Sequence, residues 1–262
     1  MDFNFTEEQG LITDSLRKAY EVNYEFDKRK TLLEDNAATY SPEMWKDLAE
    51  HGFIGLLAPE EMGGFGGEGT ELMAAAIEMS RHLALEPFLS TSVMGVRALD
   101  RAGTESQKSK IFPEVFSGEA NLAVALYEPG QRYEISPKST HAKMFDGQYI
   151  INGEKAVVVG ADSAKWIVIG AKLEGGNSKV FLIDGGVDGL TRNSYRLVDG
   201  RGAADLKLVD VPVSMDSQMA TNSAEILLSE IEDWAVTASL AETLGAMEMA
   251  RDLTHKYLST RE

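Results

Sequence analysis

Residues 120–129 of this chain read ANLAVALYEP, and residues 148–159 read QYIINGEKAVVV. The first stretch indicates a short buried strand that enters a turn. The second indicates two strands joined at Asn152-Gly153, a pair typical of tight hairpin turns. Strand patterns recur through the middle of the chain; they cover Thr140–Met144, Gln148–Ile151, Lys155–Val159, Lys165–Ala171, Lys179–Ile183, Gly189–Arg192 and Asp205–Val211. Many short strands at this spacing predict a small antiparallel barrel or sandwich.

Helical patterns flank this β region on both sides. Before it, apolar residues recur at helical spacing from Thr6 onwards, and Ser41-Pro42 marks a further helix start. After it, the helical pattern returns from about Asn222 and reaches the last residues without a stop signal, which predicts a chain cut within an element. The apolar stripe of this last predicted helix comprises Trp234, Ala238, Ala241, Leu244 and Met247. We expect self-association or pairing to cover it.

These patterns predict an α+β fold class with three domains. An N-terminal α-helical domain is expected over residues 1–119, and a middle antiparallel β-barrel or sandwich domain over residues 120–217. The remaining residues, 218–262, are expected to form the first part of a truncated C-terminal helical-bundle domain.

The composition is acidic and lacks cysteine. Lys and Arg number 25 and Asp and Glu number 42, so the formal net charge is −17. This charge disfavours binding to nucleic acid or to an anionic membrane surface. The absence of cysteine excludes disulfides and thiolate metal sites, and the four histidines lie too far apart in sequence to indicate a metal site. The sequence has no signal-peptide pattern and no transmembrane run, so we expect a soluble, cytoplasmic protein.

One glycine-rich motif is compatible with nucleotide binding. Residues 64–69 read GFGGEG and formally fit G-x-G-x-x-G. A dinucleotide site also needs a preceding strand within a βαβ unit, and here the flanking patterns are helical, so a turn between helices is favoured. A nicotinamide-dependent enzyme built on these glycines stays open as a third possibility. The nucleophile-elbow and P-loop patterns are absent from the sequence.

The middle segment resembles the acyl-CoA dehydrogenase family in the order and spacing of its motifs. Glu128-Pro129, Asn152-Gly153 and Lys155 stand where that family has T-E-P-x-A-G-S-D followed by Y-x-x-N-G-x-K, and the spacing matches without a gap. The run from Gly153 to Ala164 is similar to the smaller subunits of two-subunit enzymes of the pimeloyl-CoA dehydrogenase type. The resemblance covers the whole chain; its other stretches are Asp2-Phe3 with Thr6–Gln9, Pro59–Gly67, and Leu244-Gly245 with Tyr257 and Arg261.

The resemblance implies a flavin-dependent oxidation. Family members use FAD to convert an acyl-CoA thioester to the 2-enoyl-CoA, with a carboxylate removing the α-proton and a hydride passing to the flavin. The substrate pocket is then expected to be apolar, because each buried CH₂ contributes about 0.8 kcal/mol. The implied partners are the acyl-CoA, an electron-transferring flavoprotein, and further copies of the chain or a large acyl-CoA dehydrogenase subunit.

Five residues are implied to contact FAD. Tyr127 stands in place of the flavin-facing threonine, and Leu126 takes the neighbouring position, whose backbone meets the ring. Val157 and Val159 replace the tryptophan and threonine of the family's W-I-T segment, and valine donates no hydrogen bond from its side chain. Arg261 matches an arginine that reaches the FAD phosphates or adenosine across a subunit interface.

The implied substrate and base positions match the family less well. Tyr133 and Glu134 replace the serine and aspartate of G-S-D, where the substrate binds. The usual base is a glutamate beyond residue 262, so no catalytic base is assigned within the chain. A minority of the family places the base where this chain has Ala235; Glu232, one turn away, is a weak alternative that we interpret as a solvated helix acid.

Two functional interpretations remain open at this stage. The first is an FAD-dependent acyl-CoA dehydrogenase subunit whose base and some of whose flavin contacts come from a partner or from further sequence. The second is a non-catalytic structural subunit of a heteromeric acyl-CoA dehydrogenase with a degenerate flavin site. The replacements at Tyr127, Tyr133, Val157 and Val159 favour the second more than they would in a typical family member.

Overall fold

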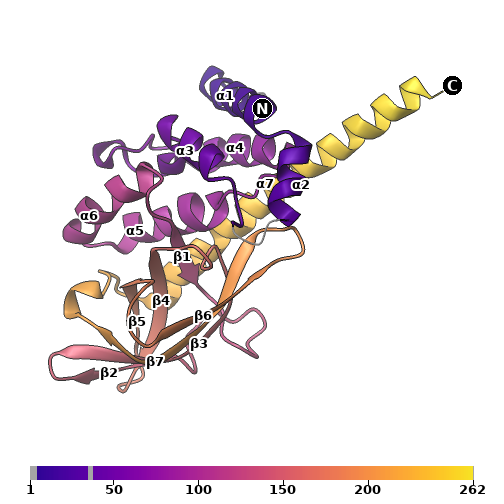
Figure 1. The fold of residues 1–262 in the computed structure, drawn as a ribbon. Coiled ribbons are helices and arrows are strands. Elements are labelled where there is room, and N and C mark those ends of the chain that lie inside the picture. Colours follow the sequence, from indigo (N-terminus) through magenta and orange to yellow (C-terminus); the bar gives the residue numbers. More distant parts are fainter. Residues whose placement is uncertain (1–4, 35–37, 262) are drawn as a thin grey trace.

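The computed structural model describes residues 5–34 and 38–261. Figure 1 shows a layer of helices on one side of a curled sheet, with the long helix α7 running along the helical layer and projecting from the body at its C-terminal end. The helices are α1 (Glu7–Asn23), α2 (Phe26–Glu34), α3 (Pro42–Glu50), η1 (Phe53–Gly55), η2 (Glu60–Met62), α4 (Gly69–Arg81), η3 (Phe88–Gly95), α5 (Val96–Ala102), α6 (Glu105–Phe116), η4 (Met215–Ser217) and α7 (Ala224–Thr260). The strands are β1 (Leu122–Ala125), β2 (His141–Phe145), β3 (Gln148–Val159), β4 (Trp166–Leu173), β5 (Ser178–Asp184), β6 (Leu190–Arg196) and β7 (Gly202–Val213).

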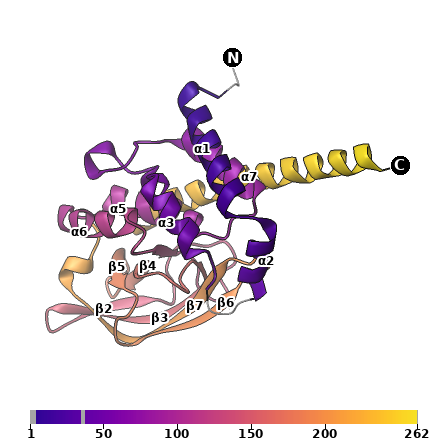
Figure 2. The same ribbon diagram turned by 45° about the horizontal axis from the view of Figure 1, so that its top comes forward.

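Strand β4 organises the sheet. It pairs in parallel with β1, from Leu122 opposite Trp166 to Ala125 opposite Ile169, and antiparallel with β5. Its end meets β2 in parallel, and β2, β3, β7 and β6 then follow as antiparallel neighbours. The seven strands therefore form one mixed sheet that curls on itself, as Figure 2 shows from a second direction.

Strand β1 is buried on both faces because it separates two apolar cores. Leu122 and Val124 point into the core shared with the helical layer. Ala123 and Ala125 point into a second core enclosed by the curled sheet. Alternate residues of a strand face opposite sides, so a four-residue apolar run can line both cores at once.

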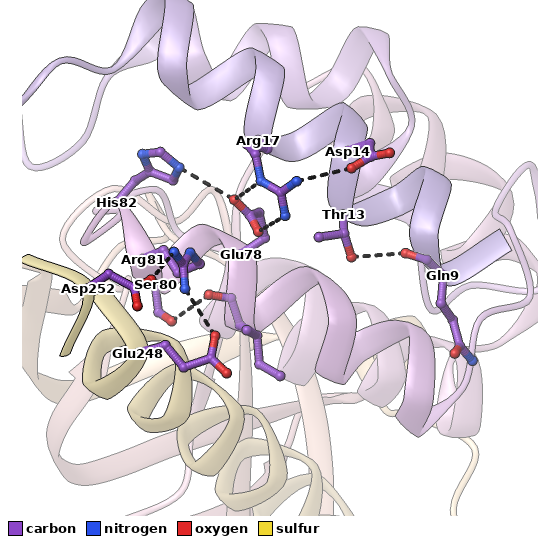
Figure 3. A network of polar contacts seen from close by, with 11 residues as sticks. Gln9, Thr13, Asp14, Arg17, Glu78, Ser80, Arg81, His82, Glu248 and Asp252 are labelled. Atoms are coloured by element: carbon purple, nitrogen blue, oxygen red, sulfur yellow. Dashed lines mark hydrogen bonds and ion pairs between the residues drawn. The ribbon is translucent and has the colours of Figure 1, made fainter. Parts of the chain in front are cut away.

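Ion pairs fix α1 and α7 to α4 (Figure 3). Arg17 of α1 contacts Glu78 of α4 at 3.1 Å, and Arg81 of α4 contacts Glu248 and Asp252 of α7 at 3.0 and 2.9 Å. Burial opposes ionisation of Glu78, yet hydrogen bonds to His82 and Arg17 hold the pKa of this carboxyl below its ordinary value. The anchored part of α7 thus has a fixed direction relative to the helical layer.

The predicted α+β class is confirmed, with two differences in the sheet. Asn152-Gly153 is not a hairpin turn, because both residues lie within the single strand β3, where a register shift against β7 marks a bulge. The sheet is mixed and not wholly antiparallel, because β1 and β2 run parallel to β4. The proposed domain limits at residues 119 and 217 stay a prediction. Asp2, Phe3 and Glu262 lie outside the described residues.

The glycine-rich motif lies between helices, as the sequence favoured. Residues 64–69 lead into α4, and the segment before them is η2, not a strand.

The apolar stripe predicted on the last helix is only partly exposed. Ala238 and Ala241 are buried within this chain, whereas Leu244 and Met247 are 45 % and 64 % exposed. Within residues 5–34 and 38–261, no helix combines the length and apolar character needed to cross a membrane.

Replacing Gly245 by alanine is predicted to destabilise the fold by about 2 kcal/mol. A Cβ there would lie 2.1 Å from the Ile77 carbonyl oxygen, which belongs to the α4 backbone and cannot easily move. The matched control is Gly10→Ala in α1, where a Cβ meets nothing within 4 Å and the better helix former should stabilise by up to about 1 kcal/mol. Urea unfolding measures both, and equal effects of the two variants would contradict the close approach of α4 and α7.

Candidate functional site

A cavity of about 420 Å³ lies between η3, the end of β3, the β6–β7 turn and α7. Val159, the last residue of β3, lines it. The apolar part of its wall comprises Met79, Leu83, Ala84, Phe88, Leu89, Leu197 and Ala246. The rest of the wall is polar, whereas the sequence led us to expect an apolar substrate pocket.

An ion pair crosses this cavity between the sheet and α7. Arg201, next to the start of β7, donates from Nη2 to Glu242 of α7 at 2.8 Å, and its Nε lies 3.5 Å from Asp199. Both side chains of the first pair are about four-fifths buried, with 20 % and 19 % exposure. Burial opposes the charge on Arg201, but the neighbouring Glu242 keeps its pKa above the ordinary value.

Glu86 is a buried carboxyl in the same wall. Its side chain is 3 % exposed, accepts a hydrogen bond from the Tyr20 hydroxyl at 3.2 Å and lies 3.4 Å from the Ser41 N–H. Burial raises the pKa of Glu86 to about 7, although these hydrogen bonds act in the opposite direction. Glu86 is therefore a titratable group at neutral pH that lines a cavity.

A second contact joins the sheet to α7, outside the wall of this cavity. The Tyr127 hydroxyl, just after β1, donates to Glu232 Oε1 at 2.6 Å. Burial and this hydrogen bond together raise the pKa of Tyr127 above its ordinary value. The interpretation of Glu232 as a solvated acid is therefore wrong, since its carboxylate is engaged and partly buried.

Tyr127 is held in place by the residue that follows it. Glu128 forms a buried ion pair with Lys155 at 3.1 Å, and both side chains are at most 1 % exposed. The same carboxylate accepts from the backbone N–H groups of residues 138, 139 and 140. Burial favours the neutral acid, but these donors and Lys155 hold the pKa of Glu128 well below its usual range.

The other residues implied by the family resemblance are dispersed. Leu126 is buried at 4 % exposure, while Tyr133 is 87 % exposed. Glu134 is exposed and pairs with Lys138. Arg261 follows α7 at its projecting end, with its guanidinium 6.0 Å from the Tyr257 ring.

The implied flavin residues do not by themselves fit an isoalloxazine ring. The Tyr127 hydroxyl is engaged by Glu232, and the Val157 N–H donates to Asp205 at 2.9 Å. Val159 offers no side-chain donor, and Arg261 is far along α7 from this wall. A flavin at this wall would therefore need donors other than the Tyr127 hydroxyl, the Val157 N–H and the Arg261 side chain.

Sequence reasoning missed Glu86, Arg201 and Glu242. The only available signal for Glu86 is an acid within the apolar run LALEPFL of residues 83–89. Arg201 and Glu242 are 41 residues apart, and no spacing rule connects them. Only the packing of α7 against the sheet brings them together.

Comparisons with known proteins place the chain in a family. The family described as "Acyl-CoA dehydrogenase, N-terminal domain" matches residues 6–119. The chain is 29 % identical over 196 residues to benzylmalonyl-CoA dehydrogenase of Aromatoleum aromaticum, covering 73 % of this chain and 51 % of the relative. It is 30 % identical over 231 residues to mitochondrial isovaleryl-CoA dehydrogenase of Arabidopsis thaliana, covering 84 % and 56 %.

Solved structures agree with this placement. A variant of the Tcur3481-Tcur3483 steroid ACAD matches with a TM-score of 0.85 and 26 % identity, covering 98 % of this chain and 68 % of that one. The helical layer, curled sheet and following long helix are thus those of an acyl-CoA dehydrogenase, and the chain belongs to the acyl-CoA dehydrogenase family. It spans about half the length of the curated relatives it matches.

Replacing Tyr127 by phenylalanine is predicted to destabilise the protein by about 1–3 kcal/mol, because a partly buried carboxylate loses its donor. The matched control is Tyr133→Phe, which removes the hydroxyl of a side chain that is 87 % exposed and should change stability by less than about 0.5 kcal/mol. Denaturant unfolding at neutral pH compares the two. An equal change in unfolding free energy for the two variants would show that the contact between Tyr127 and Glu232 is not formed in solution.

Replacing Glu86 by glutamine is predicted to change how stability depends on pH. The folded protein binds this proton more tightly than the unfolded chain, because the pKa rises from 4.5 to about 7. The wild type should therefore lose up to about 3 kcal/mol as the pH rises from about 4.5 through 7, and Glu86→Gln should not show this loss. Unfolding measured between pH 4 and 8 tests this, with exposed Glu21→Gln as the control that should follow the wild type.

Proposed function

We propose that this chain is a subunit of an FAD-dependent acyl-CoA dehydrogenase that converts an acyl-CoA thioester to the 2-enoyl-CoA. The observation that carries the proposal is the 420 Å³ cavity enclosed by η3, the end of β3 and α7, within the fold of this family. The acyl group would lie in this cavity, against the apolar side chains of η3 and α4. The chain's own residues bind and orient the acyl group there and exclude water from it.

The partners follow from the same proposal. The chain would assemble with further copies or with a large acyl-CoA dehydrogenase subunit, and the catalytic base and some of the flavin contacts would come from that partner or from further sequence. Electrons would leave through an electron-transferring flavoprotein. Leu244, Met247, Leu253 and Tyr257 are exposed on α7 and are consistent with such an assembly. The cytoplasmic location predicted from the sequence stays a prediction.

A specific observation favours a second candidate, a non-catalytic structural subunit. The bond between Tyr127 and Glu232 joins the sheet to α7 where the family resemblance implies a flavin contact, and the neighbouring Val157 N–H is engaged by Asp205. In this case the chain would stabilise a catalytic partner and hold no flavin of its own.

Flavin content and turnover separate the two candidates. The protein is purified alone and together with its large subunit, and absorbance in the visible flavin bands and acyl-CoA oxidation are measured in both. We expect the isolated chain to lack turnover, and the assembled protein to contain flavin and to oxidise acyl-CoA. Absence of flavin from both preparations would contradict the dehydrogenase proposal.

The same preparations test the assignment of the base. Turnover by the isolated chain that Glu232→Gln abolishes would contradict our view that the base lies outside it.

A further inference from the structure

The polar wall of the cavity indicates which acyl groups it accepts. We propose that the acyl group carries an uncharged oxygen, a hydroxyl above all, at the end remote from the thioester, and that Arg201 is the specificity-determining residue that binds it. This inference rests on the proposed function, because it takes the cavity to be the acyl site.

Arg201 has a hydrogen-bond donor to spare. Its Nη2 donates to Glu242 and its Nε faces Asp199. Its Nη1 makes no hydrogen bond to any of the residues that the structure describes, and the side chain lines the cavity. A guanidinium presents its donors in a fixed fork, so Nη1 remains available when the Glu242 contact is made.

The same cavity also offers acceptors. The hydroxyls of Ser80, Ser239 and Thr243 each donate to a carbonyl of their own helix. Their oxygen lone pairs remain free to accept, and all three residues line the cavity. A ligand hydroxyl both accepts and donates, so it suits a wall with open guanidinium donors on Arg201 and Arg29 and several hydroxyl acceptors. Of the two arginines, Arg201 is the one held against α7 by Glu242.

The charges of the wall disfavour other acyl groups. A carboxylate would meet Glu86, Asp199 and Glu242, and Glu242 already neutralises Arg201. Arg29 is the second cation of the wall, so three carboxyl groups still outnumber two guanidinium groups. A plain alkyl end would bury the Nη1 N–H groups without giving them an acceptor, and burying an unsatisfied donor weakens binding. The uncharged oxygen avoids both penalties.

The position of Arg201 along α7 sets which end of the acyl group it meets. Its partner Glu242 follows Glu232 by 242 − 232 = 10 residues, about 15 Å of helix. Tyr127 and Glu232 do not line the cavity; under the proposed function the thioester lies on their side of it, so the remote end of the acyl group reaches Arg201.

Binding measurements test the inference without relying on turnover. Three CoA thioesters with equal numbers of acyl carbons, ending in methyl, hydroxyl or carboxylate, are titrated calorimetrically into the assembled protein. We expect the hydroxyl thioester to bind about 5–10-fold more tightly than the methyl thioester, the effect of one hydrogen bond. The carboxylate thioester should bind most weakly.

Variants assign the preference to Arg201. Arg201→Lys keeps a cation for Glu242 but loses the planar guanidinium and with it the Nη1 donor. The preference for hydroxyl over methyl should therefore fall below about 2-fold. Arg29→Lys tests the second guanidinium of the same wall, whose Nε and Nη2 donate to the carbonyls of Leu83 and Asp199 and whose Nη1 likewise has no partner among the described residues. The preference should survive in this variant, and its loss there would overturn the assignment to Arg201. The matched control outside the cavity is Arg17→Lys, because all three guanidinium nitrogens of Arg17 are engaged by Asp14 and Glu78. Unfolding curves verify that all three variants fold.

The outcomes distinguish the inference from the proposed function. Each thioester is paired with a free alcohol or carboxylate of matching length, whose binding near Arg201 is followed by chemical-shift changes and needs no CoA groove. If no thioester binds but the alcohol binds in an Arg201-dependent way, the dehydrogenase proposal fails and the ligand preference of the cavity stands. Preference for the methyl or carboxylate end, or a hydroxyl preference unchanged in Arg201→Lys, overturns the inference.

Discussion

The buried ion pair between Glu128 and Lys155 is the contact on which the site depends. It ties the segment after β1 to β3, and the same carboxylate collects three backbone N–H groups from the loop before β2. Removing either partner would leave a buried charge uncompensated, which is strongly destabilising. The pair thereby fixes Tyr127, whose carbonyl also accepts from the Ala156 N–H at 3.0 Å.

Helix α7 supplies one wall of the cavity, and the sheet supplies another. Its position is set by the close approach at Gly245 and by the ion pairs of Arg81, and two further contacts reach it from the sheet side, from Tyr127 and from Arg201. The two contacts differ in their consequence. The first occupies the hydroxyl of a residue implied to face the flavin, whereas the second leaves one guanidinium donor open to the cavity. A chain can therefore keep the family's fold while presenting different polar groups along α7.

The sequence predicted more of the fold than of the site. The strand runs were sufficient for the α+β class, because the alternation of apolar and polar residues is a local property. The turn predicted at Asn152-Gly153 was wrong, since β3 continues through it with a bulge that depends on pairing with the distant β7. The parallel pairing of β1 with β4 was not predictable in this way, since it joins segments about 40 residues apart. Of the implied site residues, Val159 lines the cavity and Tyr127 meets Glu232, while Tyr133 and Arg261 lie elsewhere on the surface.

The sequence by itself determined where helices and strands form, the acidic charge, and the motif order that marks the family. Each of these depends on neighbouring residues or on composition, so no tertiary contact is needed to read it. Only the tertiary structure decided that Arg201 meets Glu242, that Glu86 is buried with a raised pKa, and that charged side chains line the cavity. The reason is physical: the ionisation and hydrogen bonding of a side chain depend on burial and on partners that are distant in sequence.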